Sequence, residues 1–250
     1  MQYGHFSQDK KEYIVTNPNT PRPWFNYLFN DIYHALVSST GGGYSYLKDP
    51  KYHRILRYDH ISVDRPGRYI YARDNSAGDA WSLNWQPMRK KLDSWECRHG
   101  LGYSIITSEY KGIKAEITYL VTQKDPVEIW NVKVTNTSKD KKDITLFPFA
   151  EFISGDIAME EHYRNILCLY NESDFDKASN AIVAFKHSFK EHLKYGFSFI
   201  ATSAKTSGYD CRKEIFCGPY NEVDNPVMVK NGKCTSSSCR GEDMIGVFQI

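Results

Sequence analysis

Two adjoining segments decide the fold class: YSIITSEY, residues Tyr103–Tyr110, and KGIKAEITYLVT, residues Lys111–Thr122. In the second segment, apolar and polar residues alternate, which places them on opposite faces of an extended chain. The apolar positions are Ile113, Ala115, Ile117 and Tyr119. This period of two is typical of a half-buried strand, and the Lys-Gly pair at 111–112 fits a tight turn. The stretch therefore predicts an antiparallel hairpin.

The same strand pattern recurs along the chain, and no helical pattern exceeds about three turns. The further strand-like segments are Gly67–Arg73, Val127–Ser138, Ile144–Ile153, Asn180–His187, Tyr195–Ala204, Val227–Cys234 and Ile245–Ile250. Pro148 indicates an edge strand or a bulge, and Asn231–Gly232 indicates a turn. We predict one all-β domain over residues 1–250, an antiparallel sandwich. Because the chain ends in a strand-like run, we expect more sequence after Ile250 to cover that sheet edge.

Composition narrows the class of protein. The 250 residues have a net charge of +2, which gives no reason to expect a nucleic-acid partner. No run approaches the roughly 20 apolar residues of a membrane span, and the N-terminus lacks the apolar region of a secretion signal. We therefore expect a cytoplasmic protein that binds neither nucleic acid nor membrane. The 18 Tyr, 13 Phe and 5 Trp suit strands first and sugar-stacking platforms second.

The segment Cys97-Arg98-His99 raises the question of a cysteine enzyme. On a strand, Cys97 and His99 would share a face roughly 6–7 Å apart, and a catalytic dyad usually takes its histidine from elsewhere in the chain. A structural role is the better interpretation, with Gly100 and Gly102 indicating a bend or a close backbone contact. The six cysteines are expected to be reduced, and their spacings, C-x5-C and C-x4-C at the C-terminal end, make a metal site a minor alternative.

Three other segments invite a functional interpretation. SSTGGGYS, residues Ser38–Ser45, lacks a phosphate-loop pattern and predicts a tight loop with close backbone approach. Trp24 is expected to be a buried anchor rather than a sugar platform. Residues Glu151–Asn165 break the strand pattern and mix acids with His162, Tyr163 and Arg164, which predicts a loop, either solvated or functional.

Several segments in a fixed order resemble one family. They are GHFSQDKKEYIVTNPNTPRPWFNYL (Gly4–Leu28), GGGYSY (Gly41–Tyr46), RPGRYIYARDN (Arg65–Asn75), GDAWSLNWQPM (Gly78–Met88) and ECRHGLGYS (Glu96–Ser104), followed by VEIWNVKVTNTS and ITLFPFAEF. From about residue 3 onward, the chain resembles the N-terminal region of the inverting disaccharide phosphorylases of glycoside hydrolase family 94, typified by cellobiose and chitobiose phosphorylases.

The resemblance implies a fold and an activity. The fold is a large antiparallel β-supersandwich of the galactose-mutarotase type, here expected to lack its last strands. In the family, a helical linker and an (α/α)6 barrel follow, and the barrel carries the general acid and the phosphate site. The implied reaction cleaves a β-linked disaccharide with inorganic phosphate, giving an α-sugar-1-phosphate and a monosaccharide. No cofactor or metal is implied, and the chain is expected to hold no catalytic residue and to be inactive in isolation.

The resemblance also implies a partner and a site. Such enzymes are homodimers, in which a sandwich loop reaches the neighbour's acceptor site. An Arg-Asn pair in that loop matches Arg164-Asn165, so Arg164 is the candidate sugar contact, with His162 beside it. The preceding residues, Met159–Tyr163, depart from the cellobiose-type pattern, so the sugar stays open. DRPGRYIYARD and the cysteine-containing tail resemble the chitobiose-specific branch, whereas Arg164 does not.

Two other classes of function stay open at this point. One is a free-standing carbohydrate-binding module that uses Trp81, Trp85 and Trp95 as platforms. The other is a cysteine or metal enzyme built on the six cysteines. Exposed tryptophans would favour the first, and reactive thiols or bound zinc would favour the second.

Overall fold

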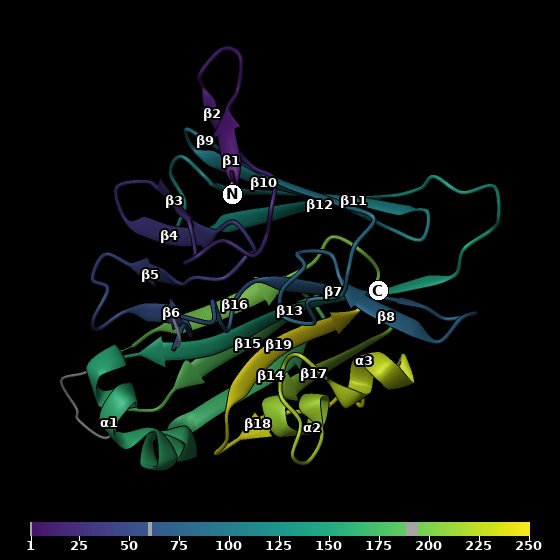
Figure 1. Ribbon diagram of the computed structural model, residues 1–250. Helices are drawn as coiled ribbons and strands as arrows, with labels where there is room; N and C mark the ends of the chain where they lie inside the picture. The colour runs from purple at the N-terminus through teal and green to yellow at the C-terminus, as the bar shows by residue number, and fades with distance from the viewer. Residues whose placement is uncertain (1, 60–61, 189–194) are drawn as a thin grey trace.

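Three antiparallel sheets make up the computed structural model, which describes residues 2–59, 62–188 and 195–250 (Figure 1). The six-stranded sheet contains, in order, β1 (Gly4–Phe6), β2 (Glu12–Val15), β9 (Ser94–Gly100), β10 (Tyr103–Tyr110), β11 (Ile113–Val121) and β12 (Glu128–Asn136). The four-stranded sheet contains β16 (Phe197–Ala201), β15 (Ala181–Lys186), β14 (Asn171–Asp176) and β18 (Cys239–Arg240).

The third sheet has nine strands and lies between the other two (Figure 1). Its main path is β17 (Gly208–Arg212), β19 (Met244–Gln249), β13 (Ile144–Gly155), β6 (Arg54–Leu56), β5 (Ser45–Leu47), β4 (Tyr33–Ser38) and β3 (Phe25–Phe29), while β7 (Tyr69–Asp74) pairs with β13 and with β8 (Asp79–Ser82). The helical elements are α1 (Ile157–Leu167), η1 (Cys168–Tyr170), α2 (Lys213–Cys217) and α3 (Val227–Asn231). The predicted all-β supersandwich is confirmed.

The hairpin predicted first is formed by β10 and β11, which pair from Tyr103–Leu120 to Tyr110–Ile113. Its turn residues Lys111 and Gly112 have φ values of 48° and 78°. Positive φ at both positions is typical of the type I′ turn that matches the twist of paired strands. The alternation is also confirmed: the four apolar positions of β11 are buried, whereas Lys114 and Glu116 are exposed.

The core is divided into clusters by the layers. One fills the space between the six-stranded and nine-stranded sheets, and includes Val15, Tyr33, Ile70, Ile106 and Ile117. A second lies between the nine-stranded and four-stranded sheets, and a third packs α2 and α3 against β7, β13 and β19. The middle sheet is therefore buried on both faces, which explains why β7 alternates between two cores rather than between core and water.

Two local expectations were wrong. Strand β13 is not an edge strand, because it pairs with β7 on one side and with β19 on the other. Pro148 is tolerated there because the ladder with β19 is interrupted at its position: paired residues begin at Phe149, and Leu146 exchanges backbone hydrogen bonds with Ile250 on the other side of the proline. Residues Val227–Asn231 form helix α3 instead of a strand, and Gly232, in the left-handed conformation, ends it.

The loop of residues 38–45 is confirmed as a close backbone contact. Gly42 forms an isolated bridge with Gly67, and a side chain at Gly42 would collide with the Asp64 carboxylate. Trp24 is half-buried against the first core cluster and meets Tyr13 edge to face, as expected of an anchor.

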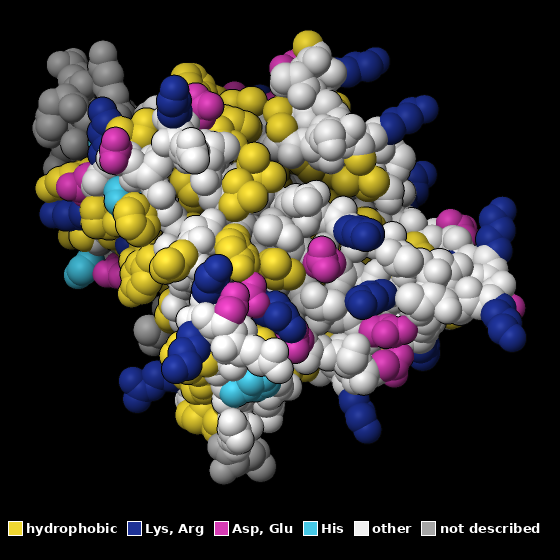
Figure 2. Space-filling view, turned by 90° about the horizontal axis from the view of Figure 1, so that it is seen from above, with side chains coloured by type: hydrophobic (Ala, Val, Ile, Leu, Met, Phe, Trp, Pro, Cys, Tyr) yellow, Lys and Arg dark blue, Asp and Glu magenta, His cyan; other side chains and the backbone are white. Residues whose placement is uncertain are grey.

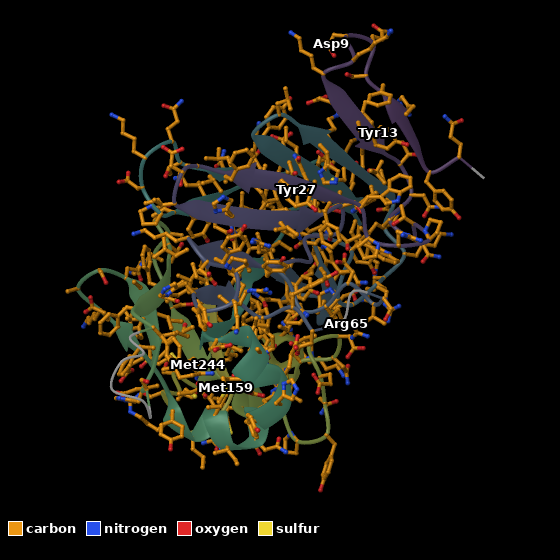
Figure 3. The ribbon with its side chains drawn as sticks, turned by 90° about the vertical axis from the view of Figure 1, so that its left-hand side faces the viewer. Asp9, Tyr13, Tyr27, Arg65, Met159 and Met244 are labelled. Atoms are coloured by element: carbon orange, nitrogen blue, oxygen red, sulfur yellow. The ribbon has the colours of Figure 1, made fainter. Side chains whose placement is uncertain are left out.

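The two ends of the molecule differ. Asp9 and Tyr13, on the β1–β2 hairpin, lie at the end opposite to Met159 of α1 and Met244 (Figure 3). Seen from above, the molecule has lysine and arginine side chains spread among acidic ones, with no single basic patch on that face (Figure 2). None of the helices in the described part of the chain is long and apolar enough to cross a membrane.

Candidate functional site

The segment predicted as a loop, residues 151–165, is a strand followed by a helix. Strand β13 continues to Gly155, and Asp156 caps α1 by accepting hydrogen bonds from the backbone N–H groups of Ala158 and Met159, at 2.9 and 3.2 Å. A capping aspartate followed by good helix formers stabilises a helix start. The helix is short and its surface largely polar, so it lacks the apolar periodicity by which sequence analysis recognises helices.

Helix α1 presents Arg164 and His162 differently. The helix is irregular at Tyr163, whose φ is −132°. His162 is exposed, and its Nδ1 lies 2.9 Å from the carbonyl oxygen of Ala158 on the preceding turn. The side chain of Arg164 instead points into a cluster of charged side chains from other segments. The structure therefore does not bring the two candidates into one arrangement.

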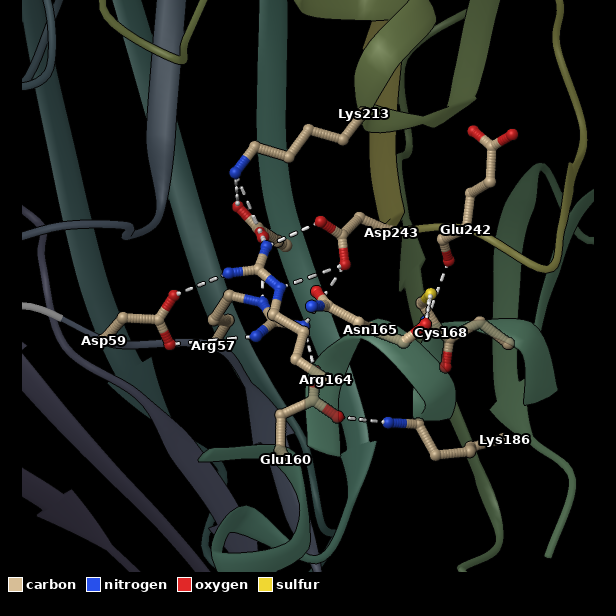
Figure 4. Close-up of polar contacts among 12 residues, drawn as sticks. Arg57, Asp59, Glu160, Arg164, Asn165, Cys168, Lys186, Lys213, Glu242 and Asp243 are labelled. Carbon is tan, nitrogen blue, oxygen red and sulfur yellow. Dashed lines mark hydrogen bonds and ion pairs between the residues drawn. The ribbon is translucent and has the colours of Figure 1, made fainter. Parts of the chain in front are cut away.

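Arg164 is held by carboxylates from other parts of the chain (Figure 4). Its Nη2 lies 2.6 Å from Asp243 Oδ2 and 3.5 Å from Glu151 Oε1, and its Nη1 lies 3.5 Å from Asp59 Oδ2. Burial opposes the charge of Arg164, but Asp243 and Glu151 outweigh it and raise the pKa of the guanidinium. The side chain is still about a third exposed, and among the described residues the ion pair of Nη1 with Asp59, at 3.5 Å, is longer than a hydrogen bond of normal length.

Arg57 lies at the centre of this cluster and is only 2% exposed. Its guanidinium lies 2.8 Å from Glu151 and 2.5 Å from Glu160, and Glu160 also lies 2.6 Å from Lys186. Burial disfavours the charge of Glu160, yet Arg57 and Lys186 lower the pKa of its carboxyl. Every charge in the cluster has a partner of opposite sign. The cations are Arg57, Arg164, Lys186 and Lys213, and the carboxylates are Asp59, Glu151, Glu160, Glu222 and Asp243.

A groove of about 790 Å³ opens beside this charge cluster. Its walls come from the end of α1, from α2 with the turn that follows it, and from the residues before β19. Arg164 and Asn165 of α1 line it together with Tyr220 and Asn221 of the turn. Tyr220 and Asn221 were not among the residues singled out from the sequence, although Gly-Pro-Tyr-Asn at 218–221 is a recognisable turn sequence.

A second groove, of about 550 Å³, lies between the free edges of β12 and β16 and is lined mainly by apolar residues. Apolar surface of this kind is typical of small-ligand sites, which add a few convergent polar groups to it. The polar groove, in contrast, offers more hydrogen-bonding groups, as a sugar would need, and it contains Arg164, one of the two residues predicted from the sequence. It is therefore the candidate site.

Cys97 and His99 share a face of β9, as expected, but they do not form a reactive pair. The thiol lies 3.8 and 3.9 Å from the two ring nitrogens of His99, closer than the backbone spacing predicted, but both nitrogens have nearer partners. His99 Nε2 is 3.2 Å from the carbonyl oxygen of Trp24, which can only accept, so Nδ1 accepts from the hydroxyl of Ser104 at 2.9 Å. Burial lowers the pKa of His99 to about 4 and raises that of the Cys97 thiol well above its usual range.

The other cysteines are no better as nucleophiles. All six thiols are free, and burial raises the pKa of Cys217 to about 12 and that of Cys239 to about 11. A thiol must ionise to act as a nucleophile or a metal ligand. Across residues 2–59, 62–188 and 195–250, no three His, Cys, Asp or Glu side chains are grouped to hold a metal ion. The cysteine-enzyme hypothesis finds no support in this geometry.

The tryptophans proposed as platforms of a binding module are not exposed. Trp81 is only 2% exposed, and Trp85 and Trp95 are half-buried. Trp95 also packs against the first core cluster and donates its indole N–H to the carbonyl oxygen of Asn84. Because a stacking platform needs an open ring face, the hypothesis of a binding module on these residues loses its basis.

Comparisons with known proteins agree on one family. The family model described as glycosyl hydrolase 94, supersandwich domain, matches residues 11–250. N,N'-diacetylchitobiose phosphorylase of Vibrio furnissii is 34% identical over 241 residues, covering 95% of this chain and 30% of the relative. Solabiose phosphorylase of Paenibacillus borealis is 34% identical over 256 residues, covering 99% and 32%. The chain thus spans about a third of the length of these curated relatives.

Proposed function

Because this chain belongs to glycoside hydrolase family 94, as its supersandwich domain, we propose that it is the sandwich part of an inverting disaccharide phosphorylase. The observation that carries this proposal is the match over residues 11–250 together with relatives that are named as disaccharide phosphorylases. In the proposed reaction, inorganic phosphate attacks the anomeric carbon while a carboxylic acid protonates the leaving oxygen, which inverts that carbon. Phosphate is a co-substrate, and the reaction needs no cofactor.

The role of this chain in that reaction is support rather than catalysis. We assign no catalytic group to it and propose that α1 contributes to a homodimer contact and to the acceptor side of the partner's active site. The exposed positions of α1, which include His162, Tyr163 and Asn165, support this assignment. Arg164 would donate from Nη1 to sugar hydroxyls, because its contact with Asp59 is long, while Asp243 and Glu151 hold Nη2.

The substrate class and the cellular compartment of the protein are also part of the proposal. The substrate would be a β-linked disaccharide, and no nucleic acid or membrane takes part in the reaction. We propose the cytoplasm as its location, because six free thiols suit a reducing compartment that also supplies inorganic phosphate.

The function is tested with the complete polypeptide that carries this chain. The protein is incubated with N,N'-diacetylchitobiose or cellobiose, with and without inorganic phosphate, and the products are followed by phosphorus NMR. We expect an α-sugar-1-phosphate that forms only when phosphate is present. Cleavage that proceeds equally without phosphate, or no cleavage of any β-linked disaccharide tried, would contradict the proposal.

The acceptor role of α1 is tested in the synthetic direction. Arg164→Lys keeps the charge but loses the planar fork of donors, so we expect the KM for the acceptor sugar to rise roughly tenfold, with a smaller change in the KM for the sugar phosphate. His162→Ala should raise the same constant less. Arg98→Lys, on an exposed arginine of β9 paired with Glu12 and Glu96, is the matched control. Equal constants for the Arg164 variant and the control would remove Arg164 from the site.

A further inference from the structure

The turn that follows α2 holds a tyrosine in an unfavourable conformation. Asn221 N–H donates to the carbonyl oxygen of Gly218 at 3.1 Å, and Tyr220, the third residue of this four-residue turn, has a φ of 60°. With proline second and a positive φ third, the turn is of type II, in which glycine or asparagine is the favoured third residue. Tyrosine at this position is strained, and its side chain is wholly exposed.

The strained conformation of Tyr220 is not offset by packing of its ring against other described residues, because the ring is fully exposed. Gly218 is confined, because a side chain there would meet Val227 at 2.5 Å, so the turn is pressed against α3 and its geometry is determined by the fold. The ring of Tyr220 is thereby carried outward at the rim of the polar groove. A strained residue with an exposed aromatic ring is a reason to look for a ligand.

The groove behind the ring is rich in hydrogen-bonding groups. Arg164 and Asn165 of α1 line the same groove as Tyr220, and Asp243 and Lys213 line it as well. Asp243 is bound by Arg164 at 2.6 Å, and Lys213 by Glu151 at 3.1 Å, so these charges are already compensated. A ligand that brings hydroxyl or amide groups suits such a surface better than an ion does.

We propose that this groove binds a pyranose ring, stacked on Tyr220 and hydrogen-bonded to Asn165, Asn221 and Nη1 of Arg164. The inference deepens the proposed function, on which it rests, because it extends the acceptor-side surface from α1 to the turn after α2. A protein partner is the less favoured occupant, since the centre of a protein interface is depleted of charged residues, whereas this groove is lined by them.

The test measures binding of N-acetylglucosamine and of glucose to the complete polypeptide, by calorimetric titration and saturation-transfer NMR. Tyr220→Gly is the informative variant, because it removes the ring and also relieves the positive φ, so it adds no backbone strain to the turn. We expect the Kd to rise roughly fivefold to tenfold in Tyr220→Gly and Tyr220→Ala. Tyr220→Trp should stay close to the wild type. Tyr27→Ala, on the exposed face of β3, is the control.

Each outcome decides the proposal. A Kd unchanged in Tyr220→Gly overturns it, as does a wild-type protein that binds neither sugar. If Tyr220→Ala changes the sedimentation behaviour and leaves sugar binding intact, the groove is a protein contact and the proposal fails. Phosphorolysis measured on the same preparations separates this result from the proposed function. If the protein catalyses phosphorolysis but its sugar affinity does not change in the Tyr220 variants, the proposed function holds and the proposed sugar site is wrong.

Discussion

The chemistry of single residues in this protein is set by burial rather than by neighbours in the sequence. Cys97 and His99 look like a nucleophile and its base, but the thiol is fully buried and both imidazole nitrogens are used by Trp24 and Ser104. Desolvation disfavours both charged forms, so neither the thiolate nor the imidazolium is populated near neutral pH. His99 therefore joins β9 to β10 and to Trp24, the residue before β3, instead of acting as a base.

His99 makes a testable contribution to the pH dependence of stability. Its pKa is about 4 in the folded protein, because of burial, and about 6.5 in an unfolded chain. Between these values the unfolded state binds the extra proton, so the free energy of unfolding falls as the pH drops below about 6.5 and levels off below about 4. We expect this residue alone to cost about 2 kcal/mol between pH 7 and pH 5, measured by denaturant unfolding.

The matched variant is His99→Gln, which can still donate and accept hydrogen bonds but does not titrate. Its stability is expected to be lower at pH 7, because the amide fits the site less well, and to change less from pH 7 to pH 5. His53, which is half-buried and outside this contact, serves as a control through His53→Gln. Equal slopes for wild type and His99→Gln would contradict the assignment.

At the scale of elements, turns decide where strands meet. In the β10–β11 hairpin, Lys111 and Gly112 both have positive φ, and a side chain on Gly112 would approach Ser138 to 2.8 Å. Gly112→Ala should therefore lower the free energy of unfolding by about 1–3 kcal/mol, through strain and crowding. Lys111→Asn, which suits the same turn, should be neutral or slightly stabilising. Denaturant unfolding of both variants checks this, and a neutral Gly112→Ala would show that the turn relaxes.

Helix α1 illustrates the opposite case, in which an element escaped sequence analysis. Its start is determined locally by Asp156, but the helix is stabilised by contacts from afar: Glu160 is buried between Arg57 and Lys186. Short helices depend on such packing more than on intrinsic propensity. A sequence of acids, histidine and arginine is compatible with both a loop and a helix. Here the contacts with Arg57 and Lys186 determine that the segment is a helix.

At the scale of the whole molecule, Arg57 connects segments far apart in the sequence. It follows β6 and contacts Glu151 of β13, Glu160 of α1 and Asp243 before β19. Arg57→Met would leave two buried carboxylates without their central partner, and we expect a loss of about 3–5 kcal/mol in the free energy of unfolding. Thermal or denaturant unfolding measures it.

The control for Arg57 is Arg98→Met. Arg98 also makes two ion pairs, with Glu12 and Glu96, but its side chain is 40% exposed. Exposed pairs contribute about 0–1 kcal/mol, so the two arginine variants should differ several-fold in their effect. Similar losses of unfolding free energy in both variants would mean that the buried cluster stabilises the fold no more than an exposed ion pair does.

By itself, the sequence determined the fold class, the hairpin and its faces, the family resemblance, and the structural role of Cys97 and His99. These features depend on the period of side chains along a strand, on turn residues and on the order of motifs, all of which are local. The tertiary structure alone decided that β13 is an interior strand, that residues 157–167 form a helix, and that Arg164 shares a charge cluster with Asp59, Glu151 and Asp243. It also placed Tyr220 and Arg164 in the lining of one groove. These features depend on which distant segments meet, and no pattern within one segment encodes the partner that lies across the sheet.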